Sequence, residues 1–325
     1  MPVDPFLEPL LSQFQPMPDD VAEHMPEFRA QAIAMVEGLV DALAEPGPEV
    51  RERRAHLVDV AGGAIEVLVY QPFEPGPHPV HLYFHGGGWV AGSAGEPGVD
   101  ILARERCIGA SCVVVSVDYR LAPEHKFPVA LNDCHAVLDW VVANADELEV
   151  RTDAITIGGG SAGANLAAAL ALKVRDEGGP SIAFQLLEVP SLDLTLSLPS
   201  HTEYDGYALH KKDVEALRIM YLPDPELVTN PYVSPLHSSD LSGLPAAHIM
   251  TAEYDMLRDD GAEYARKLRE AGVPVTVAMH AGHVHSSAGI TKTMEIARIW
   301  RDEAIATLRL ANSDAIETAE AAHVE

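Results

Sequence analysis

Short apolar runs alternate with longer segments of helical periodicity along most of this chain, and this alternation restricts the possible folds more than any other feature. The run Cys112–Val117 (CVVVSV) is continuous and mostly β-branched, which is typical of a strand buried on both faces of a parallel sheet. The stretch Val129–Val142 instead repeats its apolar residues at helical spacing. Strands and helices that alternate in this way predict an α/β fold, with a mostly parallel central sheet and helices on both of its faces.

The same patterns place the other elements of the predicted core. Further strands are expected at residues 65–70, 80–84, 155–157, 182–189, 247–251 and 273–279, and further helices at residues 162–174, 257–271 and 290–308. The N-terminal segment, residues 1–50, does not follow this alternation. It is acidic and helical but too short to bury a core of its own, so we expect it to pack on the rest of the chain.

Residues 194–244 interrupt the alternation with charges, prolines and one helical piece, Lys211–Tyr221, but no strand. An insertion between sheet elements usually forms a lid or a wall of a binding site. The predicted core therefore has two parts, residues 51–193 and 245–312. Residues 313–325 are acidic and are expected to form a frayed tail.

The charge balance limits the partners of this chain. Its 325 residues include 22 Lys and Arg against 49 Asp and Glu, which gives a net charge of −27 with neutral histidines. A surface of this sign repels phosphate groups, so neither nucleic acid nor an anionic membrane is an expected partner. With 47% apolar residues, the chain has enough material for a large core and is not a disordered protein.

The cysteines and the lengths of the apolar runs bear on where the protein is located. Three cysteines, Cys107, Cys112 and Cys134, include no C-x-x-C pair and are odd in number, which argues against a disulfide framework or a thiolate zinc site. No Lys or Arg precedes Arg29, as a signal peptide would need, and no apolar run reaches 18 residues. We therefore expect a cytoplasmic protein without a membrane-spanning segment.

The most specific local motif is Gly159–Gly163 (GGSAG), which lies between a predicted strand and a predicted helix. In a G-x-S-x-G motif of this context, the serine occupies a tight, strained turn, and the glycines leave room around it. The helix that follows directs its N-terminal N–H groups at charge that develops there. A phosphate-binding loop is the alternative, but the glycines lack the G-x-G-x-x-G spacing and no G-K-[ST] follows. Ser161 is therefore the candidate nucleophile.

A second glycine cluster, His85–Trp89 (HGGGW), directly follows the strand predicted to end at residue 84. Consecutive glycines expose backbone N–H groups, and acyl transfer needs such donors about 3 Å from the oxyanion of the tetrahedral intermediate. We expect the N–H groups of Gly86, Gly87 and Ala162 to form an oxyanion hole. A lone GGG would indicate only a flexible turn, but the position of this one after an early strand favours a functional loop.

A serine hydroxyl needs a base to accept its proton and a carboxylate to orient that base. In hydrolases with a G-x-S-x-G turn, the acid follows the serine in the chain and the histidine comes last. Asp255 and His285 each follow the end of a predicted strand, where α/β sheets place their sites. The sequence therefore predicts a triad of Ser161, Asp255 and His285.

Several neighbours compete for the roles of acid and base. The alternative carboxylates are Glu253, Asp259 and Asp260, and the alternative histidines are His280 and His283. The pair His283 and His285 also has the form of two metal ligands, but no further ligand spacing surrounds it, so neither a metal nor another cofactor is expected. No partner is predicted for His24, His201, His210 or His237.

Four longer motifs follow one another in the chain: His85–Trp89, Asp118–His125 (DYRLAPEH), Gly159–Leu166 and Tyr254–Gly261 (YDMLRDDG). Together they resemble the hormone-sensitive-lipase family of α/β-hydrolases, in its bacterial carboxylesterase branch. The resemblance extends over residues 56–310 and implies a carboxylic ester hydrolase with the triad and the oxyanion loop given above. It also implies a cap over the site, built from residues 1–50 and 194–244, and a structural role for the DYRLAPEH loop.

The resemblance also implies the class of substrate, a small ester. The sequence departs from the family pattern at two places. Capped members of the branch resemble esterases for short-to-medium acyl chains, and Trp89 with the N-terminal helices is expected to shape the substrate pocket. The residue before the nucleophile, usually acidic in the family, is Gly160, and Ser286 and Ser287 stand where Gly and Phe commonly follow the histidine. An amidase or lactonase would use the same triad, and related receptors bind small molecules on this scaffold without turnover. The helix at residues 290–308 is a candidate homodimer interface.

Overall fold

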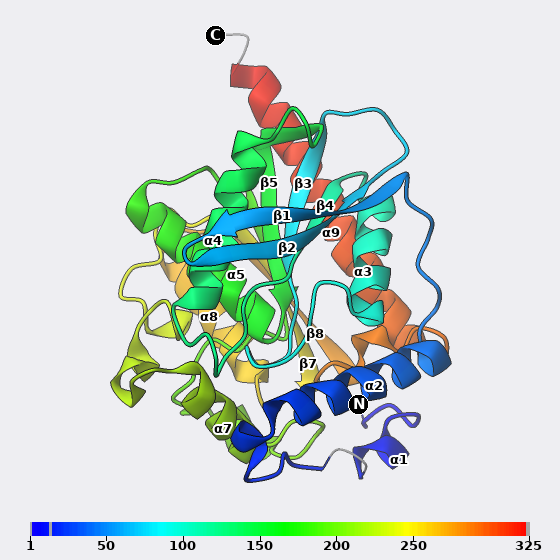
Figure 1. Cartoon of the computed structure of the whole chain (residues 1–325), viewed down its shortest axis with the longest axis vertical. Helices are drawn as coiled ribbons and strands as arrows, with labels where there is room; N and C mark the ends of the chain where they lie inside the picture. Colours follow the sequence, from blue (N-terminus) through cyan, green and yellow to red (C-terminus); the bar gives the residue numbers. More distant parts are fainter. Residues whose placement is uncertain (1, 13–14, 323–325) are drawn as a thin grey trace.

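The computed structural model describes residues 2–12 and 15–322, with side chains described as far as residue 313. Its centre is an eight-stranded sheet with the strand order β1-β2-β4-β3-β5-β6-β7-β8 (Figure 1). Strand β2 pairs antiparallel with both β1 and β4, and every other neighbouring pair is parallel. The predicted α/β fold with a mostly parallel sheet is therefore confirmed.

The elements have the following bounds. The strands are β1 (Glu52–Val60), β2 (Gly63–Gln71), β3 (His78–Phe84), β4 (Val113–Val117), β5 (Val150–Gly160), β6 (Phe184–Glu188), β7 (Ala246–Tyr254) and β8 (Val275–Val284). The helices are α1 (Glu8–Leu11), α2 (Met25–Leu43), α3 (Pro97–Gly109), α4 (Val129–Ala143), α5 (Ala162–Glu177), α6 (Ser200–Glu203), α7 (Lys211–Tyr221), α8 (Arg258–Glu270) and α9 (Glu295–Ala322). Short 3-10 turns are η1 (Val21–Glu23), η2 (Pro225–Thr229), η3 (Pro235–His237) and η4 (Ser287–Gly289).

Helices cover both faces of the sheet, and each face has its own core (Figure 1). On one face, α4, α5 and α8 pack over strand side chains such as Leu82 and Val115. On the other face, α3 and α9 pack over side chains such as Val114 and Met250. Val114 and Val115 are neighbours that point to opposite faces, and both are completely buried. This double burial is the reason why β4 reads as a continuous apolar run rather than as an alternating one.

Three elements differ from the expectation. Strand β1 (ERRAHLVDV) was not predicted, because it lies at the edge of the sheet with many exposed polar side chains and has no apolar signal. Helix α3 was not predicted either, since charged residues interrupt its few apolar ones. Helix α9 continues to Ala322, so residues 313–322 are helical and not a frayed tail; this stretch is rich in Ala and Glu, which favour helix. Residues 323–325 of the predicted tail lie outside the described residues.

The two segments predicted to form a cap lie at one end of the molecule. Helix α2, from the N-terminal segment, and α7, from the insertion, both lie beyond the ends of β7 and β8 in Figure 1. Arg29 on α2 donates hydrogen bonds to the carbonyl oxygens of Val90 (2.7 Å) and Ala122 (2.8 Å). Helix α7 approaches the glycine cluster so closely that a Cβ atom at Gly88 would lie 2.6 Å from a methyl carbon of Leu217. Both segments therefore contact the loop that follows β3.

Candidate active site

Ser161 occupies the turn between β5 and α5, in the strand–turn–helix context that the sequence predicts. Its backbone has φ 55° and ψ −115°, a conformation that side-chain-bearing residues rarely adopt. The glycine at position 163 permits the turn, because a Cβ atom there would lie 1.9 Å from the carbonyl oxygen of Phe84. The strained turn projects Ser161 at the N-terminus of α5, where the helix presents free N–H groups.

The three predicted triad residues come together in one chain of hydrogen bonds. His285 Nδ1 lies 2.7 Å from Oδ2 of Asp255, and His285 Nε2 lies 3.1 Å from Oγ of Ser161. The second oxygen of Asp255 accepts the backbone N–H of Leu257 at 2.9 Å, and the Asp255 carboxylate is completely buried. With the carboxylate at Nδ1, the imidazole holds its proton there and offers the lone pair of Nε2 to the serine hydroxyl.

The competing histidines point elsewhere. His283 is buried and hydrogen-bonds through Nδ1 to Oγ of Ser287 at 2.7 Å, and burial lowers the pKa of His283 to about 4. His280 packs against Trp300 with the rings tilted and their centroids 4.3 Å apart, and its Nε2 lies 3.3 Å from a carboxylate oxygen of Glu303. Neither imidazole is hydrogen-bonded to Ser161.

The competing carboxylates also have other partners. Glu253 accepts the backbone N–H of Gly282 at 2.8 Å, in the loop that carries the histidine. Asp259 accepts the backbone N–H of Ser200 at 3.0 Å, and Asp260 lies 2.7 Å from an imidazole nitrogen of His201. These three acids therefore hold loops in place, and Asp255 alone among the four faces His285.

The glycine cluster lies beside the nucleophile. A Cβ atom at Gly86 would lie 3.7 Å from Cβ of Ser161. Among the described residues, no backbone hydrogen bond outside the helices and strands uses the N–H of Gly86 or Gly87 as donor. Ala162 is the first residue of α5, so its N–H has no partner within the helix. These three donors lie in the region where an oxyanion hole for an ester bound at Ser161 is expected.

The loop that follows β4, with the sequence DYRLAPEH, packs against the glycine cluster. The hydroxyl of Tyr119 donates to the carbonyl oxygen of His85 at 2.8 Å, and the two rings stack with centroids 4.2 Å apart. Burial lowers the pKa of His85, so this imidazole is neutral. Asp118 accepts the backbone N–H of Ala94 at 3.0 Å, farther along the same loop. The contacts fix the backbone of the loop whose N–H groups are the candidate oxyanion donors.

Trp89 has a different environment from the one expected of a pocket residue. Its side chain is 2% exposed and stacks on Tyr221, at the end of α7, with ring centroids 4.5 Å apart. The ring therefore joins the glycine cluster to the insertion. A direct contact between Trp89 and substrate stays a prediction.

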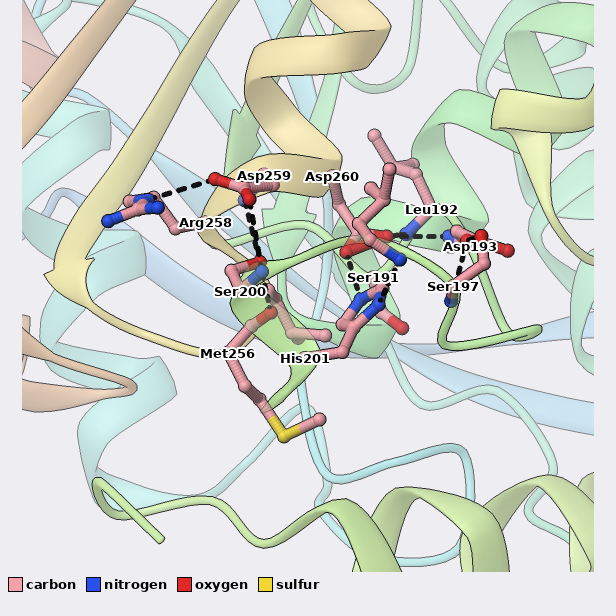
Figure 2. Close-up of polar contacts among 12 residues, drawn as sticks. Ser191, Leu192, Asp193, Ser197, Ser200, His201, Met256, Arg258, Asp259 and Asp260 are labelled. Carbon is pink, nitrogen blue, oxygen red and sulfur yellow. Dashed lines mark hydrogen bonds and ion pairs between the residues drawn. The ribbon is translucent and has the colours of Figure 1, made fainter. Parts of the chain in front are cut away.

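One group of polar residues was not connected by the sequence reasoning. His201, for which no partner was predicted, is buried against Asp260, and His237 lies 2.9 Å from Oδ1 of Asp193 (Figure 2 draws the surroundings of Asp193 and His201). The sequence carried no signal for the contact between His201 and Asp260: nearly 60 residues separate the two, and although Asp260 belongs to the YDMLRDDG motif, nothing in that motif points to His201.

The described residues contain neither a candidate metal site nor a candidate membrane span. No group of three or more His, Cys, Asp or Glu side chains in residues 2–12 and 15–322 is arranged to hold a metal ion. In the same part of the chain, no helix combines the length and the apolar character needed to cross a bilayer.

Comparison with known proteins identifies the family. A family model described as an alpha/beta hydrolase fold matches residues 81–288, a span that contains the whole candidate triad. The chain belongs to the α/β-hydrolase family. Within this family, the resemblance to the hormone-sensitive-lipase branch that the four motifs indicated is confirmed by the relatives and solved structures that the chain matches.

Individual α/β-hydrolases match over most of their length. The chain is 42% identical to the carboxylesterase NlhH of Mycobacterium tuberculosis over 237 residues, which cover 72% of this chain and 74% of that protein. It is 39% identical to an arylesterase of Saccharolobus solfataricus over 254 residues, or 78% of this chain and 82% of the relative. Among solved structures, a hyperthermophilic esterase from the archaeon Pyrobaculum calidifontis superposes with a TM-score of 0.87 at 34% identity, covering 95% of this chain and 98% of that one.

Proposed function

We propose that this α/β-hydrolase is a serine carboxylesterase, with Ser161 as nucleophile, His285 as base and Asp255 as the orienting acid. The observation that carries the proposal is the continuous hydrogen-bonded chain from Asp255 through His285 to Ser161, at 2.7 and 3.1 Å. The names of the relatives, carboxylesterase and arylesterase, support the same chemistry.

The arrangement suits acyl transfer in two steps. His285 Nε2 takes the proton of the Ser161 hydroxyl as Oγ attacks the ester carbonyl, and Asp255 stabilises the imidazolium that forms. The N–H groups of Gly86, Gly87 and Ala162 donate to the oxyanion, and one such donor typically contributes about 3 kcal/mol to transition-state binding. The imidazolium then protonates the leaving alcohol. Water, activated by the same imidazole, attacks the acyl-enzyme and releases the acid and Ser161.

The surroundings of the site support small, soluble esters with short-to-medium acyl chains as substrates. The N-terminal segment and the insertion both contact the loop that follows β3, through Arg29 to Val90 and through Leu217 to Gly88. A site covered from two sides has limited room for a long acyl chain. The net charge of −27 also disfavours adsorption to anionic lipid. The cytoplasmic location and the homodimer expected from the sequence stay predictions.

The test is hydrolysis of p-nitrophenyl esters from acetate to palmitate by the wild type, by Ser161→Ala and by Ser239→Ala. Ser239 is an exposed serine in the insertion and serves as the matched control. We expect turnover that is highest at short or medium chains, falls about 10⁴- to 10⁶-fold in Ser161→Ala and is unchanged in Ser239→Ala. Absence of turnover in folded wild type would contradict the esterase proposal and favour a binding protein. Turnover of anilides or lactones in place of esters would identify an amidase or a lactonase.

A further inference from the structure

A second buried His–Asp pair lies close to the candidate acid in the chain. His201 belongs to α6, in the insertion, and Asp260 belongs to the first turn of α8, five residues after Asp255. Both side chains are completely buried, and His201 Nε2 lies 2.7 Å from Oδ2 of Asp260 (Figure 2). Burial of two ionisable side chains is costly unless their polar atoms are paired, so the pair requires a structural explanation.

The hydrogen bonds around the pair define its protonation. The backbone N–H of Leu198 donates to His201 Nδ1 at 3.0 Å, so this nitrogen carries no proton and Nε2–H donates to Asp260. The other oxygen of Asp260 accepts the backbone N–H groups of Leu192 and Asp193, at 3.0 and 2.6 Å. One carboxylate therefore holds both ends of segment 192–201, where the chain passes from the core into the insertion, to the start of α8.

Ser200 extends the same network to the loop of the candidate acid. Its hydroxyl donates to the carbonyl oxygen of Met256 at 2.7 Å, and its backbone N–H donates to Oδ2 of Asp259 at 3.0 Å. The backbone N–H of Asp259 in turn donates to the Ser200 hydroxyl oxygen at 3.2 Å. The hydrogen bond from Ser200 to Met256 is drawn in Figure 2. Met256 directly follows Asp255 in the chain, so this bond restrains the residue next to the candidate acid.

Apolar contacts hold the same loop from the side of the insertion. Met256 and Leu257 are buried in a small cluster with Leu196 and Val214, and Val214 belongs to α7. Leu257 is also the residue whose N–H binds the second oxygen of Asp255. The loop 255–257 is therefore packed against the insertion.

We propose that His201 and Asp260 are positioning residues for the reaction: they fix segment 192–201 to the first turn of α8, and through Ser200 and Met256 they hold the carboxylate of Asp255 in line with His285. This proposal rests on the function proposed above. A triad is sensitive to such support, since a displacement of about 1 Å in a catalytic group can lower the rate about 100-fold. Under this proposal, the insertion supports the triad in addition to covering it.

The first experiment compares His201→Ala with His201→Gln, which retains a side-chain N–H donor for Asp260. The control is His248→Ala, because His248 is a buried histidine on β7 that pairs with Glu303 at 3.0 Å and belongs neither to segment 192–201 nor to loop 255–257. Competent sites are counted by stoichiometric labelling of the nucleophile with a fluorophosphonate. Values of kcat and KM for p-nitrophenyl butyrate are then expressed per labelled site.

We expect His201→Ala to lower kcat per labelled site about 10- to 100-fold, with KM changed by less than about threefold. The acidic limb of the pH profile of kcat/KM should move to lower pH, because a misplaced Asp255 stabilises the imidazolium less. His201→Gln should recover most of the loss, and His248→Ala should keep kcat per labelled site within about twofold of the wild type. A lower melting temperature with an unchanged kcat per site and an unchanged pH profile would overturn the proposal, because the pair would then support the fold alone.

Ser200→Ala provides the second variant if His201→Ala does not fold. It removes the hydroxyl bond to Met256 and leaves the His201–Asp260 pair in place, and the same loss of kcat per site is expected. An unchanged kcat per site in Ser200→Ala would likewise overturn the proposal. Failure of the wild type to hydrolyse esters or to react with the fluorophosphonate is a different result, which contradicts the proposed function itself.

Discussion

Two His–Asp pairs among the described residues have the same length but different surroundings. His285 Nδ1 lies 2.7 Å from Asp255, and His201 Nε2 lies 2.7 Å from Asp260. Asp255 lies between β7 and α8, and Asp260 lies in the first turn of α8. The pairs differ in the group at the other imidazole nitrogen: it is the hydroxyl of Ser161 in the first pair and the backbone N–H of Leu198 in the second.

This difference determines what each imidazole can do. A serine hydroxyl can lose its proton to the imidazole and then attack a carbonyl carbon, whereas a peptide N–H does not give up its proton under physiological conditions. The amide at His201 also fixes the neutral tautomer, because a proton at Nδ1 would face the proton of the Leu198 amide. A buried His–Asp pair is therefore no sign of catalysis by itself, and the atom opposite the carboxylate decides its role.

The largest expected effect separates the two pairs directly. Asp255→Asn should lower kcat about 10⁴-fold, because an amide at this place favours the wrong imidazole tautomer, while the fold is retained. Asp260→Asn should cost at most the 100-fold of a positioning residue. The measurement is kcat with p-nitrophenyl butyrate per fluorophosphonate-labelled site, with circular dichroism as the control for folding. Equal losses of kcat in the two variants would contradict the different roles assigned to Asp255 and Asp260.

The second largest expected effect is on the free energy of unfolding, and it contrasts Asp260 with Asp193, whose backbone N–H donates to Asp260. Burial raises the pKa of Asp260 to about 6, although its hydrogen bond with His201 opposes this. Burial also acts to raise the pKa of Asp193, but hydrogen bonds from Thr195, Ser197 and His237 outweigh it and hold that pKa well below its usual range. The ordinary pKa of an aspartate in an unfolded chain is about 4.

The two carboxylates should therefore give opposite pH dependences. Between pH 6 and about 4 the folded state binds a proton at Asp260 before the unfolded state does, so the contribution of Asp260 to stability rises as pH falls. Below about pH 4 the unfolded state binds a proton at Asp193 first, so the contribution of Asp193 is lost as pH falls. Melting temperatures of wild type, Asp260→Asn and Asp193→Asn from pH 3 to 8 test this, with expected relative shifts of roughly 2–5 °C. Parallel curves for both variants would contradict it.

The smallest expected effect concerns the residue before the nucleophile. Gly160 lacks the acidic side chain that usually stands there in this family, and a Cβ atom at this position would have 3.6 Å to its nearest neighbour, the hydroxyl of Tyr83. Gly160→Ala should therefore change kcat by less than about twofold and leave the melting temperature within about 1 °C. A larger loss of kcat would show that the environment of the turn, and not only the hydrogen-bond partner of His285, distinguishes the two pairs.

The sequence predicted those parts of the molecule that depend on local constraints. A nucleophile turn needs glycines at fixed positions around Ser161, and strands buried on both faces need continuous apolar runs such as that of β4. The turn and the strands can therefore be recognised from the sequence alone. The order of serine, acid and histidine then limited the triad to few candidates, and the structure brings Asp255 and His285 to Ser161.

Other features depend on contacts between distant segments and could not be predicted. The charged edge strand β1 is defined by its pairing with β2, and its own residues do not indicate a strand. The contact between His201 and Asp260 arises only in the folded chain and has no counterpart in the local sequence. The stacking of Trp89 on Tyr221 could not be predicted either, since the two residues are more than 130 positions apart in the chain.

The attachment of the insertion has a consequence for changes in chain length. Segment 192–201, which contains the last two residues of the core and the first part of the insertion, is bonded to residues 255–260, the stretch that also carries the acid of the triad. An inserted or deleted residue in either stretch would move the donors and acceptors of these hydrogen bonds out of register, so it would disturb the candidate reaction centre together with the segment that covers it.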